Sequence, residues 1–185
     1  MADGQRGRNA VGAAAFFVAM PCSVAGLLPY LMTQWQVERQ LPTGVRVGGL
    51  LLIAAGVTSV VESFVRFVGR GQGTPAAVAP PEHLVVTGQY RHVRNPMYVA
   101  LVFVVLGQAA LLGASGLVAY ATLLLVLFHL HVVMYEEPQL AKLFGAAFEA
   151  YRKGVPRWLP RLTGWNASTA GTVEQSADRR TSRCS

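Results

Sequence analysis

Charged residues and cysteines are scarce in this sequence. Only 14% of its 185 residues are charged and only 2 are cysteine, whereas 52% are hydrophobic. A soluble domain of this length needs more polar residues to cover its surface. Cys22 lies in an apolar run and Cys184 in a polar tail, which excludes a disulfide framework. With a mean hydropathy of +0.38, the composition is typical of a membrane protein.

Long apolar runs predict membrane-spanning helices at residues 10–33, 47–68, 97–112 and 117–134. About 20 apolar residues cross the roughly 30 Å of bilayer hydrocarbon, so the third run is short for a full span. A turn at residues 113–116 joins the last two runs into a helical hairpin. The first run is too long for a signal peptide and contains Pro21 and Pro29, so we expect it to be retained as a helix.

Beyond the apolar runs, hydrophobic residues recur at helical spacing over residues 136–152. This pattern predicts an amphipathic helix at the cytoplasmic interface. The expected fold is therefore all-α, an integral membrane bundle of about four transmembrane helices plus this C-terminal interfacial helix. We expect a single domain over residues 1–163 and a disordered cytoplasmic tail over residues 164–185.

Basic residues set the expected orientation, because Lys and Arg are retained on the cytoplasmic side of short loops. Most of them fall on one side of the predicted bundle, and only Arg39 and Arg46 fall on the other. Both termini are thus predicted to be cytoplasmic in a multi-pass protein, and the lack of a targeting signal favours a bacterial inner membrane. The net charge of +7 suits anionic lipid headgroups rather than nucleic acid, because the basic residues do not gather on a soluble module with base-stacking aromatics.

The hairpin of the last two runs returns the chain to the membrane face that it left. The stretch from Arg94 to Tyr98 should therefore approach Glu136 and Glu137, although the two are distant in sequence. Guanidinium groups bind carboxylate or phosphate, and carboxylates accept hydrogen bonds from hydroxyl or ammonium groups. S-adenosyl-L-methionine fits this set of partners, while a nicotinamide dinucleotide needs more compensation for its pyrophosphate.

The same residues carry a resemblance. The order YRxxRNPMY, a helical hairpin, then EEPxLxxxFGxxFxxYxxxVPRW resembles the isoprenylcysteine carboxyl methyltransferase and phospholipid N-methyltransferase superfamily of integral membrane enzymes, over residues 73–161. The resemblance implies a C-terminal half that encloses S-adenosyl-L-methionine on the cytoplasmic side, with a lateral opening for a lipophilic acceptor. Asn95 stands where the family has histidine, and Phe148 where tyrosine is common.

By this resemblance the residues expected to bind the cofactor are Tyr90, Arg91, Arg94, Asn95, Pro96, Tyr98, Glu136, Glu137, Tyr151 and Arg157. Arg94 and Glu137 are the catalytic candidates. His129 joins the set as a residue of the pocket floor, because it lies two helical turns before Glu136 on the same face; a neutral histidine bonded to another helix is the alternative.

Each candidate also has a simpler interpretation. Arg91 and Arg94 can be topology-determining charges, Glu136 and Glu137 can cap or pair across the interface, and Tyr98 can belong to an interfacial aromatic belt. Glu62 is either an ion-pair partner of Arg66 or a functional intramembrane acid. No metal is expected, because His129 and His131 face different sides of a helix and no third ligand has matching spacing.

The expected function is methyl transfer by in-line displacement from S-adenosyl-L-methionine to a lipophilic acceptor: an isoprenylcysteine-like carboxylate, a lipid or a small thiol. Two alternatives stay open, an NADPH-dependent membrane reductase of the sterol-reductase-like type and a non-enzymatic membrane adaptor.

Overall fold

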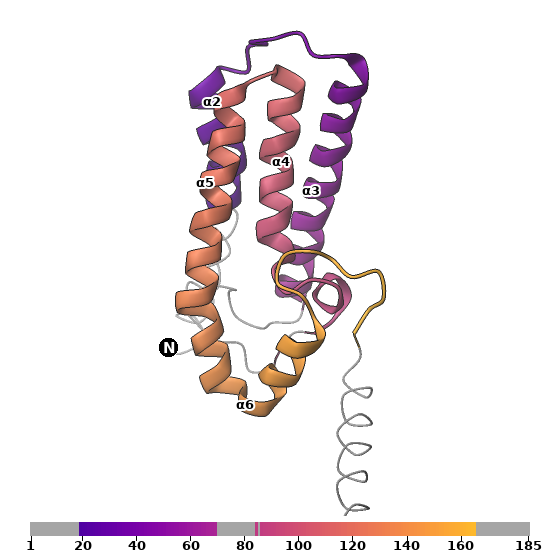
Figure 1. The fold of residues 1–185 in the computed structure, drawn as a ribbon, viewed down its shortest axis with the longest axis vertical. Coiled ribbons are helices and arrows are strands. Elements are labelled where there is room, and N and C mark those ends of the chain that lie inside the picture. Colours follow the sequence, from indigo (N-terminus) through magenta and orange to yellow (C-terminus); the bar gives the residue numbers. More distant parts are fainter. Residues whose placement is uncertain (1–18, 70–83, 85, 166–185) are drawn as a thin grey trace, which may run out of the picture. The chain divides into compact units, whose positions relative to one another are not determined.

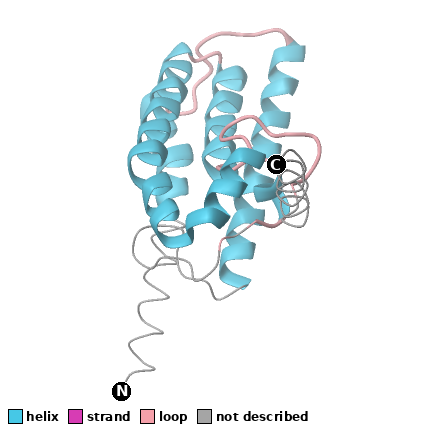
Figure 2. Ribbon diagram, turned by 60° about the horizontal axis from the view of Figure 1, so that its bottom comes forward, coloured by secondary structure: helices cyan, strands magenta, loops and turns pink. Residues whose placement is uncertain are grey.

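The structure, a computed structural model, describes residues 19–69, 84 and 86–165. All regular elements of this part are helices (Figure 2). The chain divides into two compact units. Of the described residues, 19–69 and 96–135 form the first, which we call the bundle unit, and 84, 86–95 and 136–165 form the second, which we call the Glu137 unit. The start of the first predicted helix and most of the inner loop lie outside the described residues, as does the predicted disordered tail except for Gly164 and Trp165. Trp165 is ordered and packs on the core of the second unit, so the tail begins later than predicted.

The bundle unit consists of apolar helices. A π-helical segment, η1 (Ser23–Leu27), leads into α2 (Leu28–Thr33), which is followed by α3 (Thr43–Gly69), α4 (Pro96–Leu112) and α5 (Ser115–His131). A second π-helical segment, η3 (Val132–Glu136), continues from α5. In Figure 1, α4 lies between α3 and α5. Each apolar run that the sequence predicts as a span is helical in its described part.

Two helical stretches, Thr43–Ser63 and Ser115–Gly154, are long and apolar enough to cross a membrane, and Ala19–Thr33 and Pro96–Leu112 are shorter apolar helices. In the second long stretch the apolar part is α5, while the polar residues follow from Glu136 onward. The prediction of an all-α membrane bundle is confirmed. The two compact units are a division by packing, and the single domain over residues 1–163 stays a prediction.

The central helix, α4, is buried on several sides, with Val105 0%, Leu101 1% and Ala100 2% exposed. Helix α5 instead buries one stripe at helical spacing, Leu117, Ala121, Leu124 and Phe128. Most of the rest of its surface is also apolar and exposed, as are long parts of α3, where Leu51 is 66% exposed. Helices that expose apolar side chains along their length fit contact with lipid rather than water.

Helices α3 and α4 pack closely through glycine. A Cβ atom added at Gly49 would lie 2.7 Å from the carbonyl oxygen of Gly107, and one added at Gly107 would lie 2.6 Å from the carbonyl oxygen of Gly49. About two helical turns further along α3, a Cβ added at Gly56 would lie 2.7 Å from the carbonyl oxygen of Ala100. Small residues let helix backbones approach in a membrane, where van der Waals packing drives association.

A proline shapes the helix that precedes α3. Pro29 has no N–H to offer the carbonyls four and five residues before it, those of Ala25 and Val24. Side chains from two other helices donate hydrogen bonds to these carbonyls. Gln108 Nε2 of α4 donates to the carbonyl of Ala25 at 2.7 Å, and the Tyr120 hydroxyl of α5 donates to the carbonyl of Val24 at 2.9 Å. The π-helical η1 lies over the same residues, as such segments often do where the regular ladder is interrupted.

The Glu137 unit is built on α6 (Glu137–Gly154), which agrees with the helix predicted over residues 136–152; its place at an interface stays a prediction. Gly145 interrupts the helix with φ 49° and ψ −122°. Phe148, Tyr151 and Val155 form the unit's core, against which Phe144 and Trp165 pack with other partly buried side chains. A short 3₁₀ helix, η2 (Gly88–Arg91), precedes the segment that contains Arg94.

Substituting alanine for Gly49 should destabilise the bundle unit, because the new methyl group meets the backbone of Gly107. We expect a loss of about 1–3 kcal/mol, as for other overpacked sites, measured as a lower melting temperature in detergent. The adjacent Gly48 is the matched control, since a Cβ there meets nothing within 4 Å. Gly48→Ala should be neutral or stabilising; equal behaviour of the two variants would contradict the close packing of α3 on α4.

Candidate functional site

The most concentrated polar chemistry in the Glu137 unit is a cluster of one carboxylate and two guanidinium groups. Arg94 Nη1 lies 2.8 Å from Glu137 Oε1. Arg157 binds the same carboxylate in a bidentate manner, with Nε 2.7 Å from Oε1 and Nη2 2.9 Å from Oε2. The side chains of Arg94 and Glu137 are only 10% and 11% exposed. We call these three residues the Glu137 cluster.

Local structure explains why Glu137 can serve as its centre. It is the first residue of α6, which continues directly from η3 because Glu136 is itself helical with φ −68° and ψ −50°, and it precedes Pro138. The helix thus holds the carboxylate in place while both arginines arrive from irregular segments.

Backbone hydrogen bonds position the two arginines. The segments 91–95 and 156–165 run antiparallel, because Arg94 N donates to Pro156 O at 2.9 Å and Trp165 N donates to Arg91 O at 2.9 Å. Asn95 Nδ2 donates to the carbonyl of Arg157 at 3.3 Å. These bonds place the guanidinium groups of Arg94 and Arg157 on the same carboxylate.

The charges of the cluster stabilise one another. Burial alone would raise the pKa of the Glu137 carboxyl, but the hydrogen bond from Arg157 and the charge of Arg94 outweigh it, so the pKa is lowered. Burial lowers the pKa of Arg94 against the opposing effect of Glu137, and the hydrogen bond to Glu137 raises the pKa of Arg157. Glu137 is therefore ionised at neutral pH, and both arginines are charged because a guanidinium is not deprotonated in proteins.

One atom of the cluster lacks a partner. Arg94 Nε is buried and makes no hydrogen bond among the described residues. A buried donor of a charged group that stays unsatisfied is unfavourable by about 1–3 kcal/mol or more. The Glu137 cluster thus leaves one hydrogen-bond donor of Arg94 unsatisfied.

Tyr151 and Tyr90, both predicted site residues, meet beside the cluster. The Tyr151 hydroxyl donates to the Tyr90 carbonyl at 2.7 Å. Burial raises the pKa of Tyr151, with the charge of Tyr90 adding to the effect, so its hydroxyl keeps its proton. Tyr151 therefore acts as a donor that links the core of α6 to η2.

The structure places the other predicted site residues as follows. In the Glu137 unit, Arg91 Nε donates to the carbonyl of Trp165 at 2.9 Å, and Glu136 is partly buried. Pro96, Tyr98 and His129 belong to the bundle unit. There Tyr98 stacks on Phe128 with ring centroids 4.5 Å apart, and His129 is exposed. The roles of all these residues in binding stay predictions. So does the choice between the two interpretations of Glu62, because the side chain of Arg66 is not described.

The sequence did not assign a role to His92, Arg161 or Trp165, which hold the C-terminal segment in place. His92 Nδ1 lies 2.8 Å from the Arg161 carbonyl, so this nitrogen carries the proton, and Arg161 N donates back to the His92 carbonyl at 3.0 Å. The Arg161 side chain also donates to the Gly154 carbonyl. Among the described residues, no group of three or more His, Cys, Asp or Glu side chains is placed to hold a metal ion.

Known proteins share the part of the chain that contains Arg94 and Glu137. A family model described as phospholipid methyltransferase matches residues 45–147, more than half of the chain. The chain belongs to the phospholipid methyltransferase family. The match begins in α3 and ends in α6, so it includes two members of the Glu137 cluster but not Arg157.

Two curated relatives are similar over shorter stretches. The chain is 39% identical over 82 residues to a protein-S-isoprenylcysteine O-methyltransferase from Schizosaccharomyces pombe, which is 44% of this chain and 35% of that protein. It is 30% identical over 97 residues to the cobalt-zinc-cadmium resistance protein CzcN from Cupriavidus metallidurans, which is 52% of this chain and 44% of that protein. The chain thus spans less than half the length of the curated relatives that it matches.

Replacing Glu137 with glutamine should destabilise the Glu137 unit, because two arginines lose the charge that compensates them. Removing one partner of a buried ion pair is unfavourable by roughly 3 kcal/mol, and hydrogen exchange of the α6 amides in the full chain measures the change. Glu149 is the control: its pair with Arg152 is exposed at 41% and 48%. Glu149→Gln should change stability by less than about 0.5 kcal/mol; similar exchange in both variants would show that the cluster does not hold the unit together.

Acid should weaken the same unit. Since the pKa of Glu137 is lowered below its ordinary value of 4.5 in the folded state, its contribution to stability is full above pH 4.5 and is lost as the pH falls through the folded pKa. Hydrogen exchange of α6 between neutral pH and pH 3 should show this loss in the wild-type chain and a flatter profile in Glu137→Gln. Parallel profiles would mean that another group is responsible.

Proposed function

We propose that the chain is a membrane methyltransferase that transfers a methyl group from S-adenosyl-L-methionine to a lipophilic acceptor. The observation that carries the proposal is the Glu137 cluster, a buried set of charges with an unsatisfied guanidinium donor, in a chain of the phospholipid methyltransferase family. The name of the isoprenylcysteine relative supports methyl transfer as the reaction.

The residues of the cluster fit the polar groups of S-adenosyl-L-methionine. Its carboxylate is the kind of acceptor that Arg94 Nε lacks. Glu137 Oε1 already accepts from both arginines, whereas Oε2 accepts from Arg157 alone and has capacity for a hydroxyl or ammonium donor. Arg94, Arg157 and Glu137 would therefore hold the cofactor, with Tyr90 and Tyr151 supporting them. In the bundle unit, Pro96, Tyr98 and His129 stay candidates for the remaining contacts.

The chain's own residues act by positioning. When bound, S-adenosyl-L-methionine supplies a methyl group on a cationic sulfur, which a nucleophile displaces without covalent help from the protein. Glu137 stays ionised between two arginines and Tyr151 stays protonated, so neither removes a proton from the acceptor. An acceptor that is already anionic, a carboxylate or a thiolate, suits this site better than an amine that must first lose a proton.

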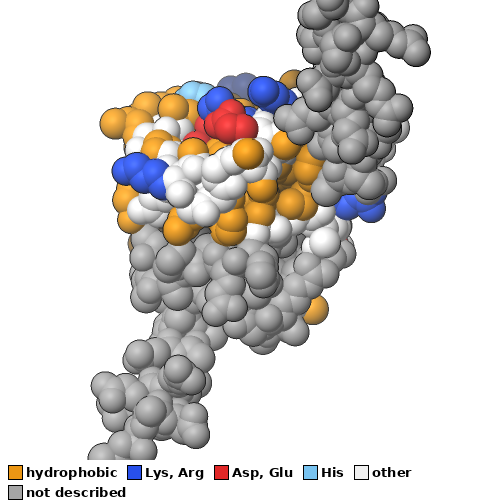
Figure 3. Space-filling view, turned by 90° about the horizontal axis from the view of Figure 1, so that it is seen from below, with side chains coloured by type: hydrophobic (Ala, Val, Ile, Leu, Met, Phe, Trp, Pro, Cys, Tyr) orange, Lys and Arg blue, Asp and Glu red, His pale blue; other side chains and the backbone are white. Residues whose placement is uncertain are grey.

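The apolar surface of the bundle unit supports an acceptor that arrives from the bilayer. Such an acceptor has a lipophilic part and an anionic nucleophile. Examples are an isoprenylcysteine-like carboxylate, an acidic lipid and a lipophilic thiol. Charged side chains of both signs lie next to each other among hydrophobic ones in Figure 3, and a surface of this kind suits the membrane interface. The excess of Lys and Arg on one side of the predicted helices favours a multi-pass membrane protein with both termini in the cytoplasm.

Binding of S-adenosyl-L-methionine to the detergent-purified full chain tests the proposal. Isothermal titration should show saturable binding, and both Glu137→Gln and Arg157→Lys should weaken it at least tenfold, because charge-assisted bidentate bonds are lost. Glu149→Gln should bind within about twofold of the wild type, since an exposed pair contributes little. NADPH should not compete. The proposal fails if no saturable binding occurs in wild-type protein whose helices are intact by circular dichroism, or if NADPH displaces the cofactor.

A further inference from the structure

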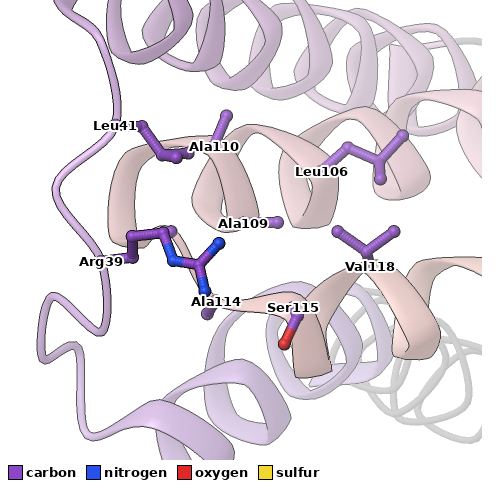
Figure 4. A pocket seen from close by; sticks show the side chains of 9 residues that line it. Arg39, Leu41, Leu106, Ala109, Ala110, Ala114, Ser115 and Val118 are labelled. Carbon is purple, nitrogen blue, oxygen red and sulfur yellow. The ribbon is translucent and has the colours of Figure 1, made fainter.

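A groove lies in the bundle unit where α4 ends and α5 begins (Figure 4). It has a volume of about 230 Å³, and its walls are apolar, formed by Leu41, Leu106, Ala109, Ala110 and Val118. Arg39 is the one charged residue that lines it. The groove shares no residue with the Glu137 cluster. Its volume is below the usual range of about 300–1,000 Å³ for small-molecule pockets, so it suits one part of a longer molecule.

The backbone holds Arg39 in place over this groove. The amides of Glu38 and Arg39 both donate to the carbonyl of Leu112, at 2.8 and 3.3 Å. Gly113 adopts φ +65°, and a Cβ there would collide with the backbone of Arg39. The loop is thus fixed on the α4–α5 turn, while the Arg39 side chain is exposed and forms no ion pair or hydrogen bond with the described residues.

Charge at the mouth of the groove favours an anion. The guanidinium of Arg39 lies close to Ala114 and Ser115 in Figure 4. Ser115 begins the 17-residue α5, and its N-cap residue Ala114 provides no side-chain hydrogen bond, so the positive end of the helix dipole adds to the charge of Arg39. Glu38 is not among the residues that line the groove.

Aromatic residues at the end of α2 indicate the depth of this region in a membrane. Tyr30 and Trp35 form an edge-to-face pair with ring centroids 5.2 Å apart, and they are 39% and 61% exposed. Exposed tyrosine and tryptophan concentrate where the bilayer meets water. The α2–α3 loop that follows Trp35 also carries Arg39, so the groove opens at the level of lipid headgroups.

We propose that this groove binds one anionic phospholipid. Its phosphate lies at Arg39 and the start of α5, and the first part of an acyl chain lies against Leu106, Ala110 and Val118. The fixed cation, the apolar walls and the opening at headgroup level match an amphiphile of this kind. A soluble anion would not contact the apolar walls, and a neutral lipid would leave the charge of Arg39 without a counter-charge. The bound lipid stabilises the α4–α5 turn and is not the methyl acceptor.

Native mass spectrometry of the detergent-purified full chain with added phosphatidylglycerol tests this site. Arg39→Gln should weaken retention of the first lipid about tenfold, as expected when a charge-assisted contact is lost. Arg39→Lys should restore much of it. Val118→Phe should also weaken retention by filling the groove. The control is Arg46→Gln, which removes an exposed arginine of α3 that does not line the groove and should change retention less than about twofold.

Two further arms separate the lipid from simpler ligands. Inorganic phosphate at millimolar concentration should not displace phosphatidylglycerol, and diacylglycerol should not bind in its place. The proposal is wrong if Arg39→Gln and Arg46→Gln behave alike, if phosphate competes, or if diacylglycerol is retained equally well. Melting temperatures of all variants in lipid-free detergent confirm that they fold.

Discussion

One carboxylate holds three segments of the Glu137 unit together. Glu137 begins α6, and the two arginines that bind it belong to the segments 91–95 and 156–165. The segments 91–95 and 156–165 are mostly irregular, so no regular pattern of backbone hydrogen bonds within either segment fixes its conformation. The antiparallel backbone bonds between them, such as Arg94 N to Pro156 O, bring the guanidinium groups to one place. If the carboxylate were neutral, the two guanidinium charges would lie close together without compensation.

The bundle unit depends on a different constraint, that backbone polar groups in hydrocarbon must find partners inside the protein. Two prolines of the chain each leave a carbonyl of the preceding helical turn without its usual N–H partner. Pro29 follows η1, and Pro138 follows η3, each two residues after the π-helical segment ends. A wider helical turn before a proline accommodates its ring and missing N–H. At the second of these points the residue between η3 and the proline is Glu137 itself, so the same local geometry precedes the charged cluster.

Much of this could be predicted from the sequence, for reasons that differ between elements. The apolar runs give the helices, because length and composition alone decide that a segment prefers lipid. The approach of Arg94 to Glu137 follows from the helical hairpin between them, because a hairpin returns the chain to the membrane face from which it started. Asn95 and His92 could not be understood in this way, since their partners are backbone carbonyls of residues 157 and 161. Every residue has a backbone carbonyl, so residue type does not show which carbonyl accepts a hydrogen bond. The loop that contains residues 157 and 161 also has no periodic pattern from which its conformation could be predicted. Similarly, the contact of Gly49 with Gly107 depends on how two helices rotate, which their uniform hydrophobicity does not specify.

The bonds at Pro29 have a consequence for the order in which the bundle forms. The carbonyls of Val24 and Ala25 receive hydrogen bonds from Tyr120 and Gln108, residues that the ribosome adds much later. Until the α4–α5 hairpin enters the bilayer, the first helix must keep these carbonyls near water or bind them to something else. The helical segment that contains Pro29 therefore reaches its final hydrogen bonding only after α4 and α5, which follow it in the chain, have packed against it.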